Sequence, residues 1–183
     1  HRRPAHLQGR EKTIAILFAD LRAFTQFSET KLPYDVVFVL NRYFAAMGEA
    51  VKQAGGHLDK FIGDGVMALF GVDVGPEAAC RQAIDAARNM ALQLQDLNAS
   101  LAHDLDQPLR IGVGIHVGPA IIGEMGYERA TSLTAIGDAV NTASRLEAMT
   151  KEFGVQVILS RRVETTAGLE LADFPMETVE IRG

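Results

Sequence analysis

Cysteine is almost absent from this chain: among 183 residues there is only Cys80. A single cysteine can form neither an internal disulfide nor a cysteine-based zinc site, which agrees with a reducing compartment. Cys80 lies in an alanine-rich amphipathic segment, where we expect a small buried apolar side chain rather than a reactive thiol. The chain must therefore be stabilised by a hydrophobic core, and a domain of this size can bury roughly 70% of its unfolded surface.

Long apolar runs and an excess of positive charge are also missing. The longest uninterrupted apolar run covers residues 14–19, whereas a membrane-spanning helix needs about 20 residues. The net charge is −5, which excludes a general nucleic-acid surface, although a few local cations could hold a smaller polyanion. We therefore expect no nucleic-acid partner and no membrane contact from this segment. The polar, basic residues 1–11 are interpreted as a linker from an upstream regulatory module, and 12–183 as one domain.

What is present is a regular alternation of strand and helix patterns. KTIAILFA (12–19) is typical of a buried strand and leads into Asp20. The apolar positions of 33–54 and 76–97 recur every three or four residues, as in amphipathic helices. Strands are expected on both sides of Gly63-Asp64-Gly65, and at 109–118, 132–136, 155–160 and 176–181; helices are expected after Gly137-Asp138, to about 153, and after 160. In 109–118, Gly112 and Gly114 leave one face of the strand without side chains, which predicts that another element packs closely against that face. This order predicts an α+β fold of the ferredoxin-like or palm type, with helices largely on one face of the sheet.

Two aspartates form the first candidate site. Asp20 ends a central strand and Asp64 lies at a hairpin tip, so the fold can bring both carboxylates together. Such a pair suits Mg²⁺ or Mn²⁺, which prefer one or two carboxylates plus substrate phosphates. Taken alone, Asp64 could equally be a turn former and Asp20 a helix cap.

A second candidate set is basic and polar. Lys60 precedes Asp64 on the same hairpin, and by itself it could be a solvated strand lysine. Asn141 and Arg145 are four residues apart on a helix and so share a face, where they could hold a phosphoryl group. By spacing alone they could also be ordinary exposed side chains. We interpret Asp138 as the N-cap of that helix rather than a metal ligand.

Three blocks of the sequence together resemble the catalytic domain of class III nucleotidyl cyclases, the family that makes cyclic AMP or cyclic GMP. They are FADLRAFT (18–25), DKFIGDGVMALFG (59–71) and LTAIGDAVNTASRLE (133–147), in the order and approximate spacing of that family. The resemblance covers nearly all of the chain from about Lys12. It implies a class III cyclase homology domain that acts on a nucleoside triphosphate.

The resemblance implies a role for each matching position. Asp20 and Asp64 match the aspartates that bind two Mg²⁺ or Mn²⁺ ions, with the carbonyl of Leu21 as a further ligand. Lys60 and Thr134 match the two purine-selecting positions. Asn141 and Arg145 match the transition-state pair. Arg182 matches a phosphate-binding cation, and it is Arg where well-known members have Lys.

The purine can be argued from hydrogen bonding. Adenine offers N1 as an acceptor and its N6 amino group as a donor, which fit a Lys donor and a Thr hydroxyl acceptor. Guanine has the reverse pattern, and guanylate-specific members usually show Glu and Cys there. Lys60 with Thr134 therefore favours ATP, and the expected activity is an adenylate cyclase that works on the cytoplasmic side.

The family resemblance also implies an active site between two domains arranged head to tail. Because this chain carries both sets of residues, we expect a homodimer with two composite sites. The alternatives are a guanylate cyclase, a catalytically silent cyclase-like module, and a palm-type polymerase or diguanylate cyclase. The chain lacks a GGDEF-like hairpin and keeps both aspartates and the Asn/Arg pair, which disfavours the last two.

Overall fold

The computed structural model describes residues 9–169, and the expected last strand at 176–181 lies outside this range. The elements follow one another as β1 (Arg10–Arg22), α1 (Phe24–Thr30), α2 (Pro33–Gln53), β2 (His57–Ile62), β3 (Gly65–Phe70), α3 (Pro76–Ser100), β4 (Arg110–Tyr127), β5 (Ala130–Ile136), α4 (Asp138–Phe153), β6 (Val157–Leu159) and α5 (Arg161–Ala167). No helix in the described part is both long and apolar enough to cross a membrane. The expected α+β class is confirmed.

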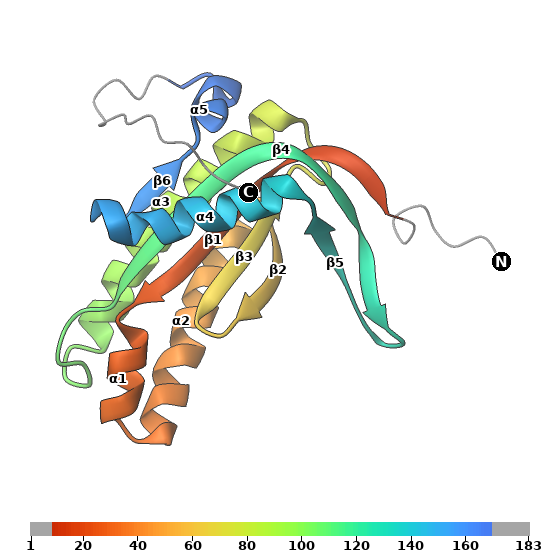
Figure 1. The fold of residues 1–183 in the computed structure, drawn as a ribbon. Coiled ribbons are helices and arrows are strands. Elements are labelled where there is room, and N and C mark those ends of the chain that lie inside the picture. Colours follow the sequence, from red (N-terminus) through yellow and green to blue (C-terminus); the bar gives the residue numbers. More distant parts are fainter. Residues whose placement is uncertain (1–8, 170–183) are drawn as a thin grey trace.

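The sheet is built around β1 and the long strand β4. Its strand order is β2-β3-β1-β4-β5, all antiparallel, with β6 added parallel to β4. The strand β1 runs on at both ends, and β4 at its C-terminal end, beyond the segments expected from their apolar patterns, because the added residues are partly exposed and break the alternation. The paired β4–β5 segments extend as a curved arm from the body of the sheet (Figure 1).

Most helices of the described chain pack on one face of this sheet, as expected, and α4 packs on the other face (Figure 1). Successive residues of β1 point to opposite faces, and both sets are buried. One set, including Ala15 and Leu17, packs with α2, α3 and α5 in the main core, which also contains the fully buried Cys80. The other set, including Ile14 and Ile16, packs under α4 in a smaller cluster. This second layer positions α4 over the candidate site.

The helix α2 has nearly the expected bounds and part of the expected buried face, since Met47 and Val51 of the periodic pattern are buried. Val37, one of the apolar positions of the periodic pattern, is 56% exposed, whereas Val39 and Tyr43 are fully buried. The helix contains more apolar residues than one face can hold, so the pattern allowed two orientations. Packing on the sheet selected the one that leaves Val37 and Phe38 exposed.

Two glycines of β4 explain why α4 lies so close to the sheet. A Cβ atom on Gly114 would lie 2.2 Å from the backbone nitrogen of Glu147, and one on Gly112 would lie 2.2 Å from Thr150 Oγ1. The closely packed neighbour predicted from these glycines is therefore α4. The N-cap of α4 is Gly137 and not Asp138 as expected; Asp138 is the first residue inside the helix.

Candidate active site

The strand register brings the two predicted metal ligands together. Asp20 pairs with Gly65 of β3, and Asp64 is the residue just before Gly65 in the hairpin turn. The two carboxyl groups lie close enough for the negative charge of Asp20 to raise the pKa of Asp64. Leu21, the third predicted ligand, follows Asp20 within the same strand. The antiparallel pairing of β1 with the hairpin thus brings together two aspartates that are far apart in the sequence.

The electrostatics of Asp64 reflect this crowding. Burial raises its pKa to about 7, and the negative charge of Asp20 acts in the same direction. A backbone hydrogen bond of its own and the positive charge of Lys151 oppose the shift. Two carboxyl groups therefore compete for the same small volume, a condition that a proton or a cation relieves.

A third carboxyl group, which the sequence reasoning missed, comes from α4. Burial raises the pKa of Glu147 to about 7, assisted by the charge of Asp20 and opposed by Lys151 and Arg22. Glu147 and Asp20 also line a cavity of about 140 Å³. Gly114 was the sequence signal that could have indicated this contact. Because Gly114 has no side chain, α4 can approach the sheet and place Glu147 against β1 and β4.

The donor set fits a hard divalent cation. One oxygen of Asp20, Oδ1, is buried and accepts no hydrogen bond from the described residues. Within residues 9–169 no three Asp, Glu, His or Cys side chains converge as a complete metal centre. A site with two carboxylates and one carbonyl agrees with Mg²⁺, which keeps several positions for water and substrate phosphates.

A buried tyrosine lies beneath this carboxyl cluster. The hydroxyl of Tyr43 is fully buried and has no hydrogen-bond partner among the described residues. Burial raises its pKa far above the usual value, and the charges of Asp20, Asp64 and Glu147 raise it further. Tyr43 comes from α2, so elements from both faces of the sheet contribute to the surroundings of these carboxyl groups.

The two predicted purine-selecting residues are linked by a residue that the sequence reasoning did not single out. Asp59 accepts a 2.5 Å hydrogen bond from Thr134 Oγ1 through its Oδ2, and its Oδ1 lies 3.8 Å from Lys60 Nζ. Lys60 and Asp59 are on β2 and Thr134 is on β5, the two ends of the strand order. The curved arm therefore brings the predicted purine pair together within one chain.

The predicted transition-state pair lies on α4. Asn141 is exposed and Arg145 is partly buried, and their spacing puts both on one side of the helix. The cations that act on Asp64 and Glu147 are Lys151 and Arg22; neither Lys60 nor Arg145 is among them in the described chain. Arg182 lies outside the described residues.

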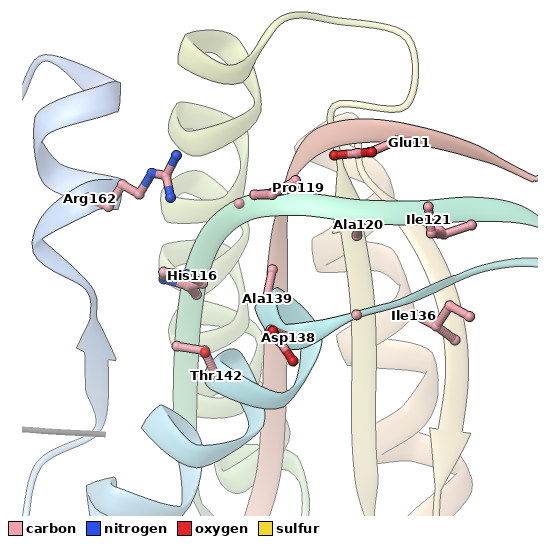
Figure 2. A pocket seen from close by; sticks show the side chains of 12 residues that line it. Glu11, His116, Pro119, Ala120, Ile121, Ile136, Asp138, Ala139, Thr142 and Arg162 are labelled. Atoms are coloured by element: carbon pink, nitrogen blue, oxygen red, sulfur yellow. The ribbon is translucent and has the colours of Figure 1, made fainter. Parts of the chain in front are cut away.

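A second cavity lies elsewhere, at the N-terminus of α4. It measures about 350 Å³, and Figure 2 shows His116 of β4, Arg162 of α5 and Asp138 of α4 among its lining side chains. His116 is held by a 2.8 Å hydrogen bond between its Nδ1 and Ser160 Oγ. None of the predicted metal, purine or transition-state residues lines this cavity.

Comparison with known proteins shows the family to which the chain belongs. Residues 7–181 match the family described as the adenylate and guanylate cyclase catalytic domain. An adenylate cyclase of Anabaena cylindrica is 38% identical over 83% of this chain and 30% of its own length. Adenylate cyclase 1 of Rhizobium meliloti is 31% identical over 97% of this chain and 27% of its own length. The chain thus spans less than a third of these curated relatives.

Two solved structures share the fold, and one is named a guanylyl cyclase and the other an adenylyl cyclase. The guanylyl cyclase Cya2 has a TM-score of 0.79 and 34% identity, covering 87% of this chain and 80% of that chain. The adenylyl cyclase CyaB from P. aeruginosa has a TM-score of 0.79 and 28% identity, covering 88% and 83%. The family match covers residues 7–181, nearly the whole chain. This chain belongs to the family of class III adenylate and guanylate cyclase catalytic domains.

Proposed function

We propose that this domain is an adenylate cyclase that converts ATP into 3′,5′-cyclic AMP and pyrophosphate. The observation that carries the choice of ATP is the purine pair of Lys60 and Thr134, joined through Asp59. Lys60 donates to N1 of adenine, and the Thr134 hydroxyl accepts from the N6 amino group. The curated relatives named adenylate cyclase support the same choice.

The reaction is an intramolecular displacement. The ribose 3′-oxygen attacks the α-phosphorus, the bond from that phosphorus to the bridging oxygen of the β-phosphate breaks, and pyrophosphate leaves with its electrons. The 3′-hydroxyl proton passes to solvent, because no side chain in the described chain is an evident general base for it. Asn141 orients the ribose, and Arg145 holds the α-phosphoryl oxygens as their charge develops.

Asp20, Asp64 and the carbonyl of Leu21 are the residues that would hold two Mg²⁺ or Mn²⁺ ions. When bound, the ions supply positive charge that favours ionisation of the 3′-hydroxyl and stabilises the leaving pyrophosphate. The crowded carboxyl groups support this assignment, since the pKa of Asp64 is already raised by burial and by its neighbour Asp20. Arg182 is proposed to bind the β- and γ-phosphates.

We propose a homodimer with two composite sites. Lys151 lowers the pKa of Asp64 and Glu147, and Arg22 lowers that of Glu147, whereas Lys60 and Arg145 of the same chain are not among the groups that act on them. The purine and transition-state groups are therefore available to a partner's carboxylates. Apolar side chains are exposed along α2 and the β2–β3 hairpin, as a subunit interface requires. They include Tyr34, Val37, Phe38, Phe61 and Ile62.

The curated relatives are longer than this chain. An upstream regulatory module joined through residues 1–11 stays a prediction. ATP is produced and used in the cytoplasm, so we place the domain on the cytoplasmic side, whether or not the full protein is tethered to a membrane.

The test of activity compares cyclic nucleotide production from ATP and GTP with Mg²⁺ or Mn²⁺. We expect cyclic AMP from wild type, rising faster than linearly with protein concentration, and none from Asp64→Ala. Cyclic GMP as the main product would favour the alternative raised by the similarity to Cya2, a guanylate cyclase. No product from confirmed dimers would favour a silent module.

The test of assembly mixes two inactive variants. Asp20→Ala lacks a metal ligand and Asn141→Ala lacks a transition-state residue, so a mixed dimer has one intact site and one doubly defective site. We expect activity to reappear on mixing. Absence of rescue, with mixed dimers demonstrated by differently tagged chains, would contradict the composite site.

A further inference from the structure

Asp59 occupies an irregular position in the sheet. The register between β2 and β3 passes from Leu58↔Ala68 to Lys60↔Met67, which leaves Asp59 as the extra residue of a β-bulge. A bulge interrupts the alternation of a strand and re-aims its side chains. The side chain of Asp59 is fully buried, while that of the next residue, Lys60, is 46% exposed and still reaches Asp59 Oδ1 at 3.8 Å.

The hydrogen bond from Thr134 to Asp59 determines the orientation of the Thr134 hydroxyl. A carboxylate can only accept hydrogen bonds, and a hydroxyl has one proton to donate. At 2.5 Å, Thr134 Oγ1 donates that proton to Asp59 Oδ2. Only the lone pairs of the Thr134 oxygen then remain for a ligand, so the hydroxyl can accept a hydrogen bond but cannot donate one.

A second contact holds the same two strands together. His57 Nε2 lies 3.3 Å from the carbonyl oxygen of Leu133, next to the Asp59–Thr134 pair. Because β2 and β5 are the two ends of the strand order, no backbone ladder fixes their distance. These side-chain contacts fix it instead, and with it the position of Lys60 relative to Thr134.

We propose that Asp59 is a positioning residue for nucleotide selection. Because Asp59 accepts the hydroxyl proton of Thr134, the site selects a purine that presents a hydrogen-bond donor to the Thr134 oxygen. Adenine has such a donor in its N6 amino group, whereas guanine presents the O6 acceptor, which would face an oxygen without a proton. This inference rests on the proposed function, in which Thr134 contacts the purine.

The first experiment replaces the carboxylate by its isosteric amide. In Asp59→Asn the amide can donate to Thr134 Oγ1, which frees the hydroxyl proton for guanine O6. We expect the ratio of kcat/KM for ATP to that for GTP to fall about tenfold, the effect of roughly one hydrogen bond. Asp96→Asn, an exposed change of the same charge on α3, should leave the ratio unchanged. A purely structural role of Asp59 would lower both activities and keep their ratio.

A double-mutant comparison isolates the route through Thr134. Thr134→Val has no hydroxyl to orient, so adding Asp59→Asn to it should not change the ratio further. A ratio that is unchanged in folded Asp59→Asn, or that Asp59→Asn still shifts in the Thr134→Val background, would overturn the proposal.

A charge-repair pair keeps the proposal testable if Asp59→Asn alone folds poorly. Thr134→Asp puts a second carboxylate against buried Asp59 and should lose nucleotide binding, and the added Asp59→Asn should restore it. Failure of this repair counts against the proposal.

Measurements of nucleotide binding distinguish a failure of this inference from a failure of the proposed function. The affinities of α,β-methylene-ATP and its guanine counterpart, measured by calorimetry on the same variants, give the preference without turnover. If wild type makes no cyclic nucleotide, the proposed function fails, yet the binding ratio of wild type against Asp59→Asn still decides the role of Asp59.

Discussion

Glu147 on α4 lines one cavity with Asp20 on β1, and the negative charge of Asp20 raises the pKa of Glu147, so a third carboxyl group lies beside the two predicted metal ligands. The contact exists because Gly114 lets the helix backbone approach the sheet. Lys151 and Arg22 offset only part of the resulting negative charge, since the pKa values of both Glu147 and Asp64 are raised to about 7. The stability of the metal-free domain should therefore depend on pH and on cations.

The pH dependence has a definite sign. In the unfolded chain Asp64 and Glu147 titrate near pH 4, and in the metal-free folded domain at about 7, so the folded state binds more protons between these values. Their contribution to stability is present below about pH 4 and is lost as the pH rises through about 7. We expect Glu147→Gln to lose less thermal stability than wild type between pH 5.5 and 7.5 in EDTA.

The matched control for this experiment is Glu152→Gln, an exposed change on the same helix, which should follow wild type. Calorimetric melting temperatures of the three proteins are compared. An equal change between the two pH values for wild type and Glu147→Gln would contradict the assigned titration.

Divalent cations should reverse this effect. Mg²⁺ binding requires deprotonated carboxylates, so titration of the metal-free domain with Mg²⁺ at pH 7 should release protons. The measured heat should vary with the ionisation enthalpy of the buffer, and the melting temperature should rise more at pH 7.5 than at 5.5. Asp64→Asn should abolish both responses. Proton release that persists in Asp64→Asn would move the cation site elsewhere.

Tyr43 carries a buried hydroxyl without a partner among the described residues. Removing only that hydroxyl in Tyr43→Phe takes away an unsatisfied polar group, so we expect a free energy of unfolding that is unchanged or about 1 kcal/mol higher. Tyr43→Ala removes the packed ring and should cost about 3–5 kcal/mol. Urea denaturation of the metal-free protein measures both. A clear loss of stability in Tyr43→Phe would mean that the hydroxyl has a partner.

Gly114 is required for the approach of α4. The Cβ of Gly114→Ala would meet backbone atoms of Ala143 and Glu147 rather than a flexible side chain. We expect a loss of about 1–3 kcal/mol in the free energy of unfolding, together with lower activity, because Arg145 moves with the helix. Gly48→Ala is the control: it lies in α2 with its nearest atom at 3.9 Å, and alanine should stabilise the helix.

Arg145 should act on the transition state rather than on nucleotide binding. Arg145→Ala is expected to lower kcat by about 100- to 1,000-fold with a much smaller change in KM. Arg145→Lys should recover little, because an ammonium cannot reproduce the fork of a guanidinium. Arg88→Ala, which removes an exposed arginine of α3, should leave both constants unchanged. A change confined to KM would contradict the role.

Local patterns determined much of the architecture. Proline near the first turn and glycine after the end delimited α2, and Gly137 and Gly154 delimit α4, because these residues act through their own backbone. The turn at Gly63–Gly65 predicted the hairpin, and the hairpin carried Asp64 back to Asp20. The family motifs are concentrated in these same segments, which is why the candidate metal and transition-state residues could be named from the sequence.

Only the tertiary structure decided which side chains surround them. The apolar residues of α2 permitted more than one buried face, and packing against the sheet chose Tyr43 over Val37. Glu147 reaches Asp20 through a helix-to-strand contact, and Asp59 reaches Thr134 because the curved arm brings the two end strands together. Such contacts depend on register, curvature and side-chain direction over long sequence separations. Periodicity along a chain carries no information about these, since the partner that fixes each side chain is on another element.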